Sequence, residues 1–396
     1  MATNGGSRKK VSTFTLENVG QISKACVRLG DLTVLVGPQA TGKSVFLQLF
    51  HLNKDYQFVR NTLKRHGYDW KKDWGQFLDL TLGEGMCGLW SETSKVLCDN
   101  KPQDLPANVL GAGKGKNLRH CFYIPAQRVL VMQNGWPRAF TNFQMKDPYV
   151  VRNFGEDLRL LMEAGLGSGE EGLFPKDGKL KKGLRHLLQE RLYQGGGLKL
   201  DTNSPQKRLI LEVGGSSLPF MVWSAGQREF TPLLLGLYWL LPSTKQAKPG
   251  IDWVVLEEPE MGLHPLGLSV VLLFVFELIG RGYKVLISTH SPQVLEMVWA
   301  LKEIKKCGGG YQDVLRLFDA NGDSSLKSTA ETALASDISV SYFAHTSPCR
   351  VESKDISELD PGSEAPEEAN WGGLAEFGGR AAEIVSEVVN RKKATR

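Results

Sequence analysis

The sequence predicts an α/β fold with a parallel core sheet, for three reasons. An apolar run at Leu32–Val36 leads into a glycine-rich turn and then into a stretch with helical apolar spacing. Two short β-rich runs at 253–256 and 285–288 are joined by an apolar helix at 266–280, which gives a βαβ unit. The 396 residues are 41% hydrophobic, enough for a sizeable core.

The remaining elements follow from local patterns. Before the turn we expect three strands, of which the first two form a small antiparallel sheet packed on the core: Ser12–Val19, 24–29 and Leu32–Val36. After it we expect a helix at about 43–52, a mixed region at 53–120, a strand at Cys121–Ile124 and an inserted helical lobe from about 130 to 200. Farther on we expect a hairpin at 209–213 and 220–223, a helix at 230–241, an acidic solvated linker at 352–370 and an amphipathic helix at 379–391.

The glycine-rich turn, GPQATGKS at residues 37–44, matches the P-loop pattern G-x-x-x-x-G-K-[ST]. Backbone N–H groups at a helix N-terminus lack intrahelical partners and attract a polyanion, and glycine lets the backbone approach the phosphates. Lys43 would reach the β- and γ-phosphates, and the Ser44 hydroxyl would ligate Mg²⁺. A chance match is the alternative, but a strand before and a helix after favour nucleotide binding. The nucleotide contacts expected here are Gly37, Gln39, Thr41, Gly42, Lys43, Ser44 and Val45.

Acidic and histidine side chains end the two later core strands. VVLEEPEMGLHP at 254–265 puts Glu257 and Glu258 at the carboxyl end of an apolar strand, where parallel sheets bind ligands. Glu257 would hold Mg²⁺, and Glu258 would polarise the attacking water as general base. His290 ends the neighbouring strand and could orient that water or sense the γ-phosphate. The structural alternatives are an acidic helix cap and a core histidine.

Two further motifs lie near expected strand ends. WSAGQRE at 223–229 makes Ser224, Ala225 and Gly226 a second N–H-rich helix start suited to an anion. One polypeptide rarely needs two phosphate cradles for one nucleotide. If the second serves a nucleotide held by a neighbouring subunit, the sequence encodes a sandwich dimer. YIPAQR at 123–128 adds Gln127, a candidate contact to Mg²⁺ or water.

Composition narrows the class of protein. The net charge of +5 is weak, and two basic clusters are either solvated faces or nucleic-acid contacts: Lys176, Lys179, Lys181, Lys182 and Arg185, and Lys64, Arg65, Lys71 and Lys72. Six cysteines without C-x-x-C spacing argue for reduced thiols and against a zinc site or a disulfide framework. Residues 1–11 read as a flexible lead-in, and the longest apolar run is too short for a bilayer, so we expect a cytoplasmic protein without a membrane partner.

Taken in order, GPQATGKS, YIPAQR, WSAGQRE, VVLEEPEMGLHP and STHSP resemble the motifs of ABC-class P-loop ATPase heads of the SMC, RecF and OLD-nuclease type, over roughly residues 12–320. The resemblance implies an ABC-type head with ATP and Mg²⁺ as ligands. It assigns a Q-loop at Gln127, a signature at Ser224, Ala225, Gly226 and Gln227, a Walker B motif with the metal ligand Glu257 and the catalytic Glu258, and a switch histidine at His290, with Ser44 and Gln127 also on the metal. The chain departs from the family at Gln39, where Asn is usual, in SAGQ for SGGQ, and at Glu257, where transporters carry Asp.

The pairing EEPE…LHP and the tail NWGGLAEFGGRAAEIV at 370–385 are similar to stand-alone ATPases of prokaryotic anti-phage systems of the PARIS and Septu types. OLD nucleases continue into a Toprim domain with an acidic metal cluster. Asp319, Asp323 and the tail acids lack that arrangement, so a nuclease is expected to be a separate protein. The expected divisions are 1–11 lead-in, 12–129 first core lobe, 130–205 helical insertion, 206–320 second core lobe and 321–396 C-terminal extension.

We therefore expect an ATPase that forms a homodimer or higher oligomer by ATP sandwiching and gates a separate effector, a nuclease, in anti-phage defence. The alternative is a DNA-maintenance ATPase in which the basic lobe at 176–185 grips a duplex. A transporter subunit fits less well, because the interval between Ser44 and Ser224 is long and EEPE is atypical. If hydrolysis is very slow, the alternative is a non-enzymatic scaffold.

Overall fold

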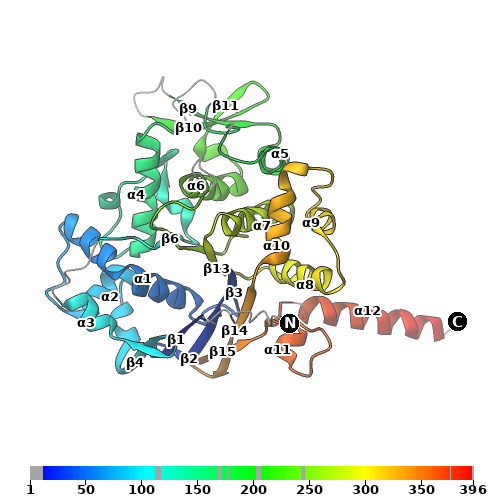
Figure 1. Ribbon diagram of the computed structural model, residues 1–396, viewed down its shortest axis with the longest axis horizontal. Coiled ribbons are helices and arrows are strands. Elements are labelled where there is room, and N and C mark those ends of the chain that lie inside the picture. Colours follow the sequence, from blue (N-terminus) through cyan, green and yellow to red (C-terminus); the bar gives the residue numbers. More distant parts are fainter. Residues whose placement is uncertain are drawn as a thin grey trace, which may run out of the picture.

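A computed structural model of the chain describes residues 12–111, 117–166, 172–176, 178–201, 207–241, 246–374 and 376–394. The predicted lead-in at 1–11 lies outside these ranges. A ten-stranded sheet organises the molecule, with the order β5-β4-β1-β2-β15-β14-β3-β13-β12-β6 (Figure 1).

Five neighbouring strands form the parallel core of this sheet: β14 (Ile338–Ser347), β3 (Leu32–Val36), β13 (Lys284–Ser288), β12 (Trp253–Glu257) and β6 (Cys121–Ile124). Every residue of β3, β12 and β6 is buried, as expected for parallel strands that are covered on both faces. The predicted α/β fold with a parallel core sheet is therefore confirmed.

The other five strands extend the same sheet: β1 (Ser12–Val19), β2 (Ile22–Leu29), β4 (Trp90–Cys98), β5 (Lys101–Gln103) and β15 (Arg350–Asp355). β1 pairs antiparallel with β2 and with β4, as predicted for the N-terminal part. This antiparallel part and the parallel core belong to one sheet, because β2 pairs with β15 and β15 pairs with β14.

The late strands also correct the interpretation of residues 352–370 as a linker, since residues up to Asp355 belong to β15. β14 lies between β3 and β15 and pairs in parallel with β3. Its polar residues Ser339 and Ser341 are buried, and the Ser339 hydroxyl donates a hydrogen bond to the Arg28 carbonyl (2.7 Å). These buried serines break the apolar pattern that would have indicated a core strand.

The helices surround the sheet, and α12 projects from the body (Figure 1). They are α1 (Lys43–Arg65), α2 (Trp74–Leu82), α3 (Leu105–Leu110), α4 (Tyr149–Glu163), α5 (Lys182–Arg191), α6 (Ala225–Leu240), α7 (Pro265–Gly280), α8 (Pro292–Lys306), α9 (Tyr311–Leu317), α10 (Lys327–Ala335), α11 (Pro366–Ala369) and α12 (Glu376–Ala394). α1 packs on β6, β12 and β13 and is longer than predicted, because Val59 and Leu63 continue its buried face beyond a kink at Asp55.

Two small sheets lie beside α4 and α6. One contains β9 (Gly197–Asp201), β10 (Arg208–Val213) and β11 (Ser216–Pro219), and the other is the hairpin of β7 (Met132–Gln133) and β8 (Trp136–Pro137). The hairpin predicted at 209–213 and 220–223 exists, but its second strand was placed too late, since Phe220–Val222 forms a 3₁₀ turn. The division of the chain into lobes stays a prediction.

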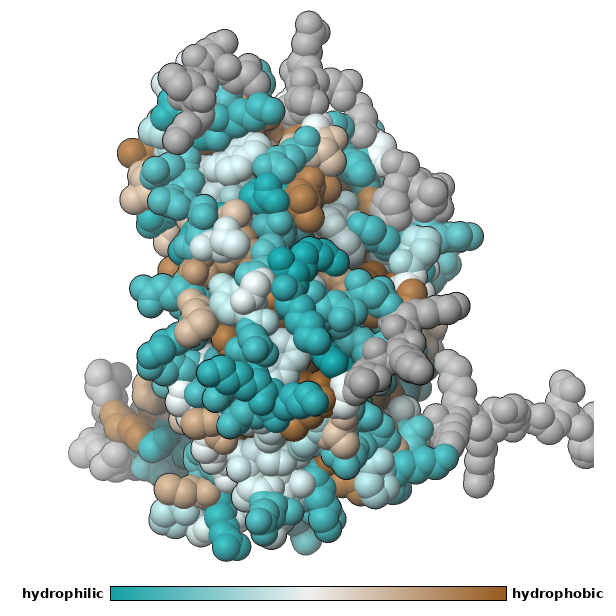
Figure 2. Space-filling model, turned by 90° about the vertical axis from the view of Figure 1, so that its left-hand side faces the viewer, coloured by the Kyte–Doolittle hydropathy of each residue, from teal (hydrophilic) through white to brown (hydrophobic). Residues whose placement is uncertain are grey.

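Figure 2 shows the surface that lies on the left-hand side of Figure 1. This surface is mostly hydrophilic, and its apolar areas are small and separate. Among the helices of the described ranges, none is both long and apolar enough to cross a membrane.

Candidate functional site

The P-loop joins β3 to α1 and depends on two glycines. Gly37 has φ 144°, and a Cβ there would lie 2.4 Å from the Phe343 carbonyl oxygen of β14. Gly42 precedes α1 with φ 84°, and its carbonyl accepts the first helical hydrogen bond from Phe46 (2.9 Å). Because a side chain at either position would meet backbone strain, and at Gly37 also a carbonyl, glycine is required here.

Lys43 is nearly buried and bonded to its own loop. Its Nζ donates to the carbonyls of Gly37 and Pro38, both at 2.8 Å, and lies 3.3 Å from the Thr41 hydroxyl. Burial lowers the pKa of Lys43 to about 8, while Glu258 and Glu260 oppose the change. The Lys43 ammonium group therefore donates to carbonyl oxygens of the loop. In a nucleotide complex, phosphate oxygens would accept these hydrogen bonds instead.

Glu257 ends β12 with its carboxylate in the interior. It is 2% exposed, and one carboxylate oxygen accepts from the Ala126 amide at 3.3 Å. Burial raises the pKa of Glu257 to about 7, and hydrogen bonding from Ser44 and Ala126 limits the rise. The other oxygen is buried and accepts no hydrogen bond from the described residues, as suits a carboxylate that receives a cation. Ser44 and Glu257 together fit the predicted Mg²⁺ site.

Glu258 and His290 meet at the carboxyl ends of adjacent strands. The His290 Nε2 atom lies 3.9 Å from the nearer Glu258 carboxylate oxygen, and both side chains are about one-third exposed. Glu258 has φ 42°, a conformation that is rare without glycine, and its amide donates to the Ser288 carbonyl at 2.9 Å. Burial lowers the pKa of His290, Lys43 lowers it further and Glu258 opposes both.

Glu260 holds the backbone at this histidine. One of its carboxylate oxygens accepts from the His290 amide at 2.6 Å and from the Thr289 hydroxyl at 3.0 Å. Burial raises the pKa of Glu260, and the His290 amide opposes the rise. The motif EEPE already contained this third acid, so its spacing after Glu257 was the available signal.

The predicted signature residues begin α6. Ser224 is the N-cap: its hydroxyl accepts from the Gln227 amide at 3.3 Å, and the Gln227 side chain accepts from the Ser224 amide at 3.0 Å. Ser224 and Ala225 are exposed. Among the described residues, no hydrogen bond joins this helix start to the P-loop of the same chain. Gln127 is exposed after β6, and no hydrogen bond of the described chain joins its side chain to Ser44 or Glu257.

Apart from the start of α6, these motifs lie along one edge of the sheet, at the carboxyl ends of β3, β12, β13 and β6, and an antiparallel N-terminal part extends that sheet. Residues 157–296 match a family model described as "AAA domain, putative AbiEii toxin, Type IV TA system". The match covers roughly a third of the chain and includes Ser224, Glu257, Glu258 and His290 but not the P-loop. The described chain therefore has an α/β fold whose parallel core sheet carries the P-loop, and its middle part is similar to that AAA domain.

Solved structures with similar chains include two Smc head domains and the recombination mediator protein RecF. The Smc head bound to the C-winged helix domain of ScpA is 9% identical, with 87% of this chain and 97% of that chain covered and a TM-score of 0.40. The SMC head domain from Thermotoga maritima is 12% identical, with coverage of 88% and 99% and a TM-score of 0.36. RecF with ATP is 13% identical, with coverage of 70% and 93% and a TM-score of 0.32. A comparison with curated proteins finds no significant match.

The chain contains a buried arginine that the sequence pattern did not single out. Arg128 is 0% exposed and follows Gln127 directly. Its guanidinium donates to five carbonyls, those of Glu229, Glu257, Glu258, Pro259 and Met261, at 3.1–3.5 Å. Arg128 therefore joins the Q-loop, the loop after β12 and the signature helix, and it fixes the backbone of Glu258.

The signature helix and the loop after β12 also touch through glycine. A Cβ on Gly226 would lie 2.9 Å from the Gly262 carbonyl oxygen, and Gly262 has φ 69°. The departure SAGQ therefore keeps the glycine that this contact requires, while Ala225 takes the exposed position before it.

Proposed function

We propose that this chain binds and hydrolyses ATP with Mg²⁺ in a site that a second copy of the chain completes. The observation that supports hydrolysis best is the Glu258–His290 pair, 3.9 Å apart at the strand edge that also carries Lys43 and Glu257. A partly exposed carboxylate beside a histidine of lowered pKa is suited to accept a proton from water.

Each residue of the site has one role in the proposed reaction. Lys43 and the amides at the start of α1 hold the triphosphate, and Ser44 with Glu257 supplies oxygen ligands for the metal. Mg²⁺, when bound, offsets negative charge on the β- and γ-phosphates. Glu258 takes the proton of the attacking water, and His290, whose backbone Glu260 holds, positions that water.

The proposal of a second copy rests on the signature. The Ser224 amide is used in the capping box, but the amides of Ala225 and Gly226 at the same helix start make no hydrogen bond among the described residues, and Met221 and Val222 beside them are 65% and 62% exposed. Large apolar side chains next to an anion-binding helix start favour contact with another protein surface. A γ-phosphate held on a partner's P-loop would satisfy these N–H groups.

Two variants of one chain test this arrangement. Lys43→Ala removes the phosphate cation, and Ser224→Arg blocks the signature, so each protein alone should hydrolyse almost no ATP. In an equal mixture, half of the dimers pair the two variants and each has one intact composite site, which should restore about a quarter of wild-type turnover. No recovery on mixing, with both variants folded by circular dichroism, would refute sharing of the site.

Trapping gives an independent measurement. Glu258→Gln keeps the side-chain size and removes the base, so ATP should convert this variant to a species of at least twice the mass in light scattering. Lys43→Ala is the matched control, because it should stay at the starting mass with ATP. An unchanged mass for Glu258→Gln, measured with ATP bound, would contradict ATP-driven assembly.

We further propose that assembly gates a separate effector, a nuclease, in anti-phage defence, as the resemblance of EEPE…LHP and of the tail implies. The test combines this chain with the product of the neighbouring reading frame and plasmid DNA. Cleavage should require both proteins and ATP, and Lys43→Ala should abolish it. Cleavage that is equal without this chain would contradict gating.

DNA maintenance is the second candidate, and one observation favours it. Lys71 and Lys72 both have positive φ, and with Arg60 and Lys64 they line a hollow of about 380 Å³ at the end of α1. In the other basic cluster, Lys181 is already bonded to Glu277, Ser328 and Thr329. Duplex binding that weakens steeply with salt and is reduced by Lys71→Glu with Lys72→Glu would support this candidate. Unchanged binding by that double variant would count against it.

A further inference from the structure

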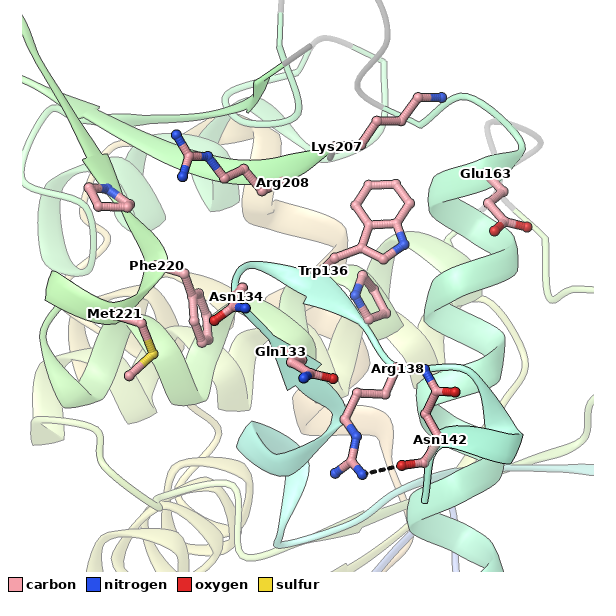
Figure 3. A pocket seen from close by; sticks show the side chains of 12 residues that line it. Gln133, Asn134, Trp136, Arg138, Asn142, Glu163, Lys207, Arg208, Phe220 and Met221 are labelled. Atoms are coloured by element: carbon pink, nitrogen blue, oxygen red, sulfur yellow. Dashed lines mark hydrogen bonds between the residues drawn. The ribbon is translucent and has the colours of Figure 1, made fainter. Parts of the chain in front are cut away.

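A polar hollow of about 680 Å³ lies between the β7–β8 hairpin, α4 and the β10–β11 hairpin. Its volume is in the range of small-ligand sites. Among its lining side chains are Trp136, Arg138, Asn142, Lys207 and Met221, shown with their neighbours in Figure 3. Met221 also lies beside the proposed signature, whereas the other four residues belong to no part of the ATP site described above.

Two cations in this hollow have no acidic partner among the described residues. Arg138 donates to the backbone carbonyls of Leu130 and Asn142 and lies 3.9 Å from the centre of the Phe143 ring. Lys207 is exposed, and within the described part of the chain it makes no hydrogen bond or ion pair. The acid of the hollow, Glu163, is already paired with Arg159. The hollow therefore carries a net positive charge that suits an anion.

Trp136 supplies a flat apolar face in the same place. Its indole is half-buried, and no ring contact with another aromatic residue occupies it in the described chain. In the view of Figure 3 the ring lies between Lys207 and Arg138. Amide side chains of Gln133 and Asn142 lie in the same lining. An aromatic face, cations and amides together match the base, phosphate and base-edge groups of a nucleotide.

We propose that this hollow binds a phosphorylated nucleoside outside the P-loop, with the base against Trp136 and phosphate oxygens near Arg138 and Lys207. Two sources present this chemistry, a free nucleotide and a nucleotide of a single strand. The exposed position of Lys207 and the open rim leave room for either.

The hollow is connected through packed residues to Ser224, the start of the proposed signature. The turn of the β7–β8 hairpin contacts β10, where the Leu209 amide donates to the Gly135 carbonyl at 2.8 Å, and a Cβ on Gly135 would lie 3.2 Å from Phe220. Phe220 packs on Trp223 with ring centres 5.0 Å apart, one residue before Ser224. This coupling rests on the proposed function: a ligand in the hollow would bias the position of the signature and thus ATP-dependent assembly.

Binding is tested on the Lys43→Ala chain, so that the P-loop does not contribute. Isothermal titration with AMP, with inorganic phosphate and with an oligothymidylate should give saturable binding of AMP, of the oligonucleotide or of both. Inorganic phosphate should bind about tenfold more weakly than the better nucleotide probe, because it cannot use Trp136. AMP binding assigns a free nucleotide, and binding of the oligonucleotide alone assigns a strand.

Lys207→Glu and Trp136→Leu, each added to Lys43→Ala, should weaken binding about tenfold or more. Matched controls are Lys182→Glu, an exposed lysine outside the hollow, and Trp299→Leu, a tryptophan 38% exposed on α8. Absence of saturable binding by every probe overturns the proposal, and so does equal affinity of the hollow variants and the controls. Binding without any effect on assembly overturns the coupling alone, and failure of the ATP sandwich leaves the binding result intact.

Discussion

Replacing Arg128 with methionine should destabilise the protein by about 3–5 kcal/mol, the cost of removing one member of a buried charged network. The side chain is 0% exposed and serves five carbonyls, in addition to a contact of 3.8 Å with the Glu229 carboxylate. Each hydrogen bond to a charged group contributes roughly 1.5–3 kcal/mol, and these values do not add when one side chain makes them all. Methionine fills similar space, so lost hydrogen bonding dominates the change.

Urea unfolding followed by circular dichroism measures the loss of stability, and ATP turnover is measured at a temperature where the variant is folded. Turnover should fall at least tenfold, because Glu258 loses the contacts that hold its positive-φ backbone. Arg128→Lys should be intermediate. The control is Arg316→Met, whose side chain is 75% exposed beside Asp313 and should cost at most about 1 kcal/mol. Equal stability and turnover of Arg128→Met and wild type would refute the positioning role.

Three further predictions follow from other contacts. Gly226→Ala should lower the free energy of unfolding by about 1–3 kcal/mol and weaken ATP-dependent assembly, because its Cβ would overlap the Gly262 carbonyl. Ala225→Gly is the control and should lower the melting temperature by far less. Burial lowers the pKa of His51 to about 3, so the folded state holds this histidine neutral. The stability that neutral His51 gives the folded state is complete above pH 6.5 and is lost on acidification. The stability difference between wild type and His51→Gln should therefore shrink by about 1.4 kcal/mol per pH unit below 6.5 in urea titrations, and a constant difference would contradict this. Glu257→Gln should make ATP affinity independent of Mg²⁺ in equilibrium dialysis, and a retained Mg²⁺ dependence would place the metal elsewhere.

The sequence predicted the elements with simple patterns and missed those set by distant partners. β1, β3 and β6 have the predicted bounds because short apolar or alternating runs end at clear turns. β14 was missed because Ser339 and Ser341 are buried polar residues whose environment includes β2, more than 300 residues earlier.

The same distinction holds at the candidate site. The P-loop, the acidic pair and His290 were found because their residue types and spacing are local. Arg128 reads as an ordinary surface cation until α6, the end of β12 and the loop after β12 enclose it with five carbonyls. No local periodicity encodes that enclosure, so only the three-dimensional arrangement identifies it.

The place of β14 has a consequence for synthesis of the protein. The strand that carries the P-loop has one neighbour from residues 284–288 and the other from residues 338–347, and the Phe343 carbonyl closes over Gly37. A ribosome must therefore release most of the polypeptide before the nucleotide pocket can mature. Fragments left by premature termination before residue 338 would lack that neighbour, so the P-loop strand of an unfinished copy would have an unpaired edge.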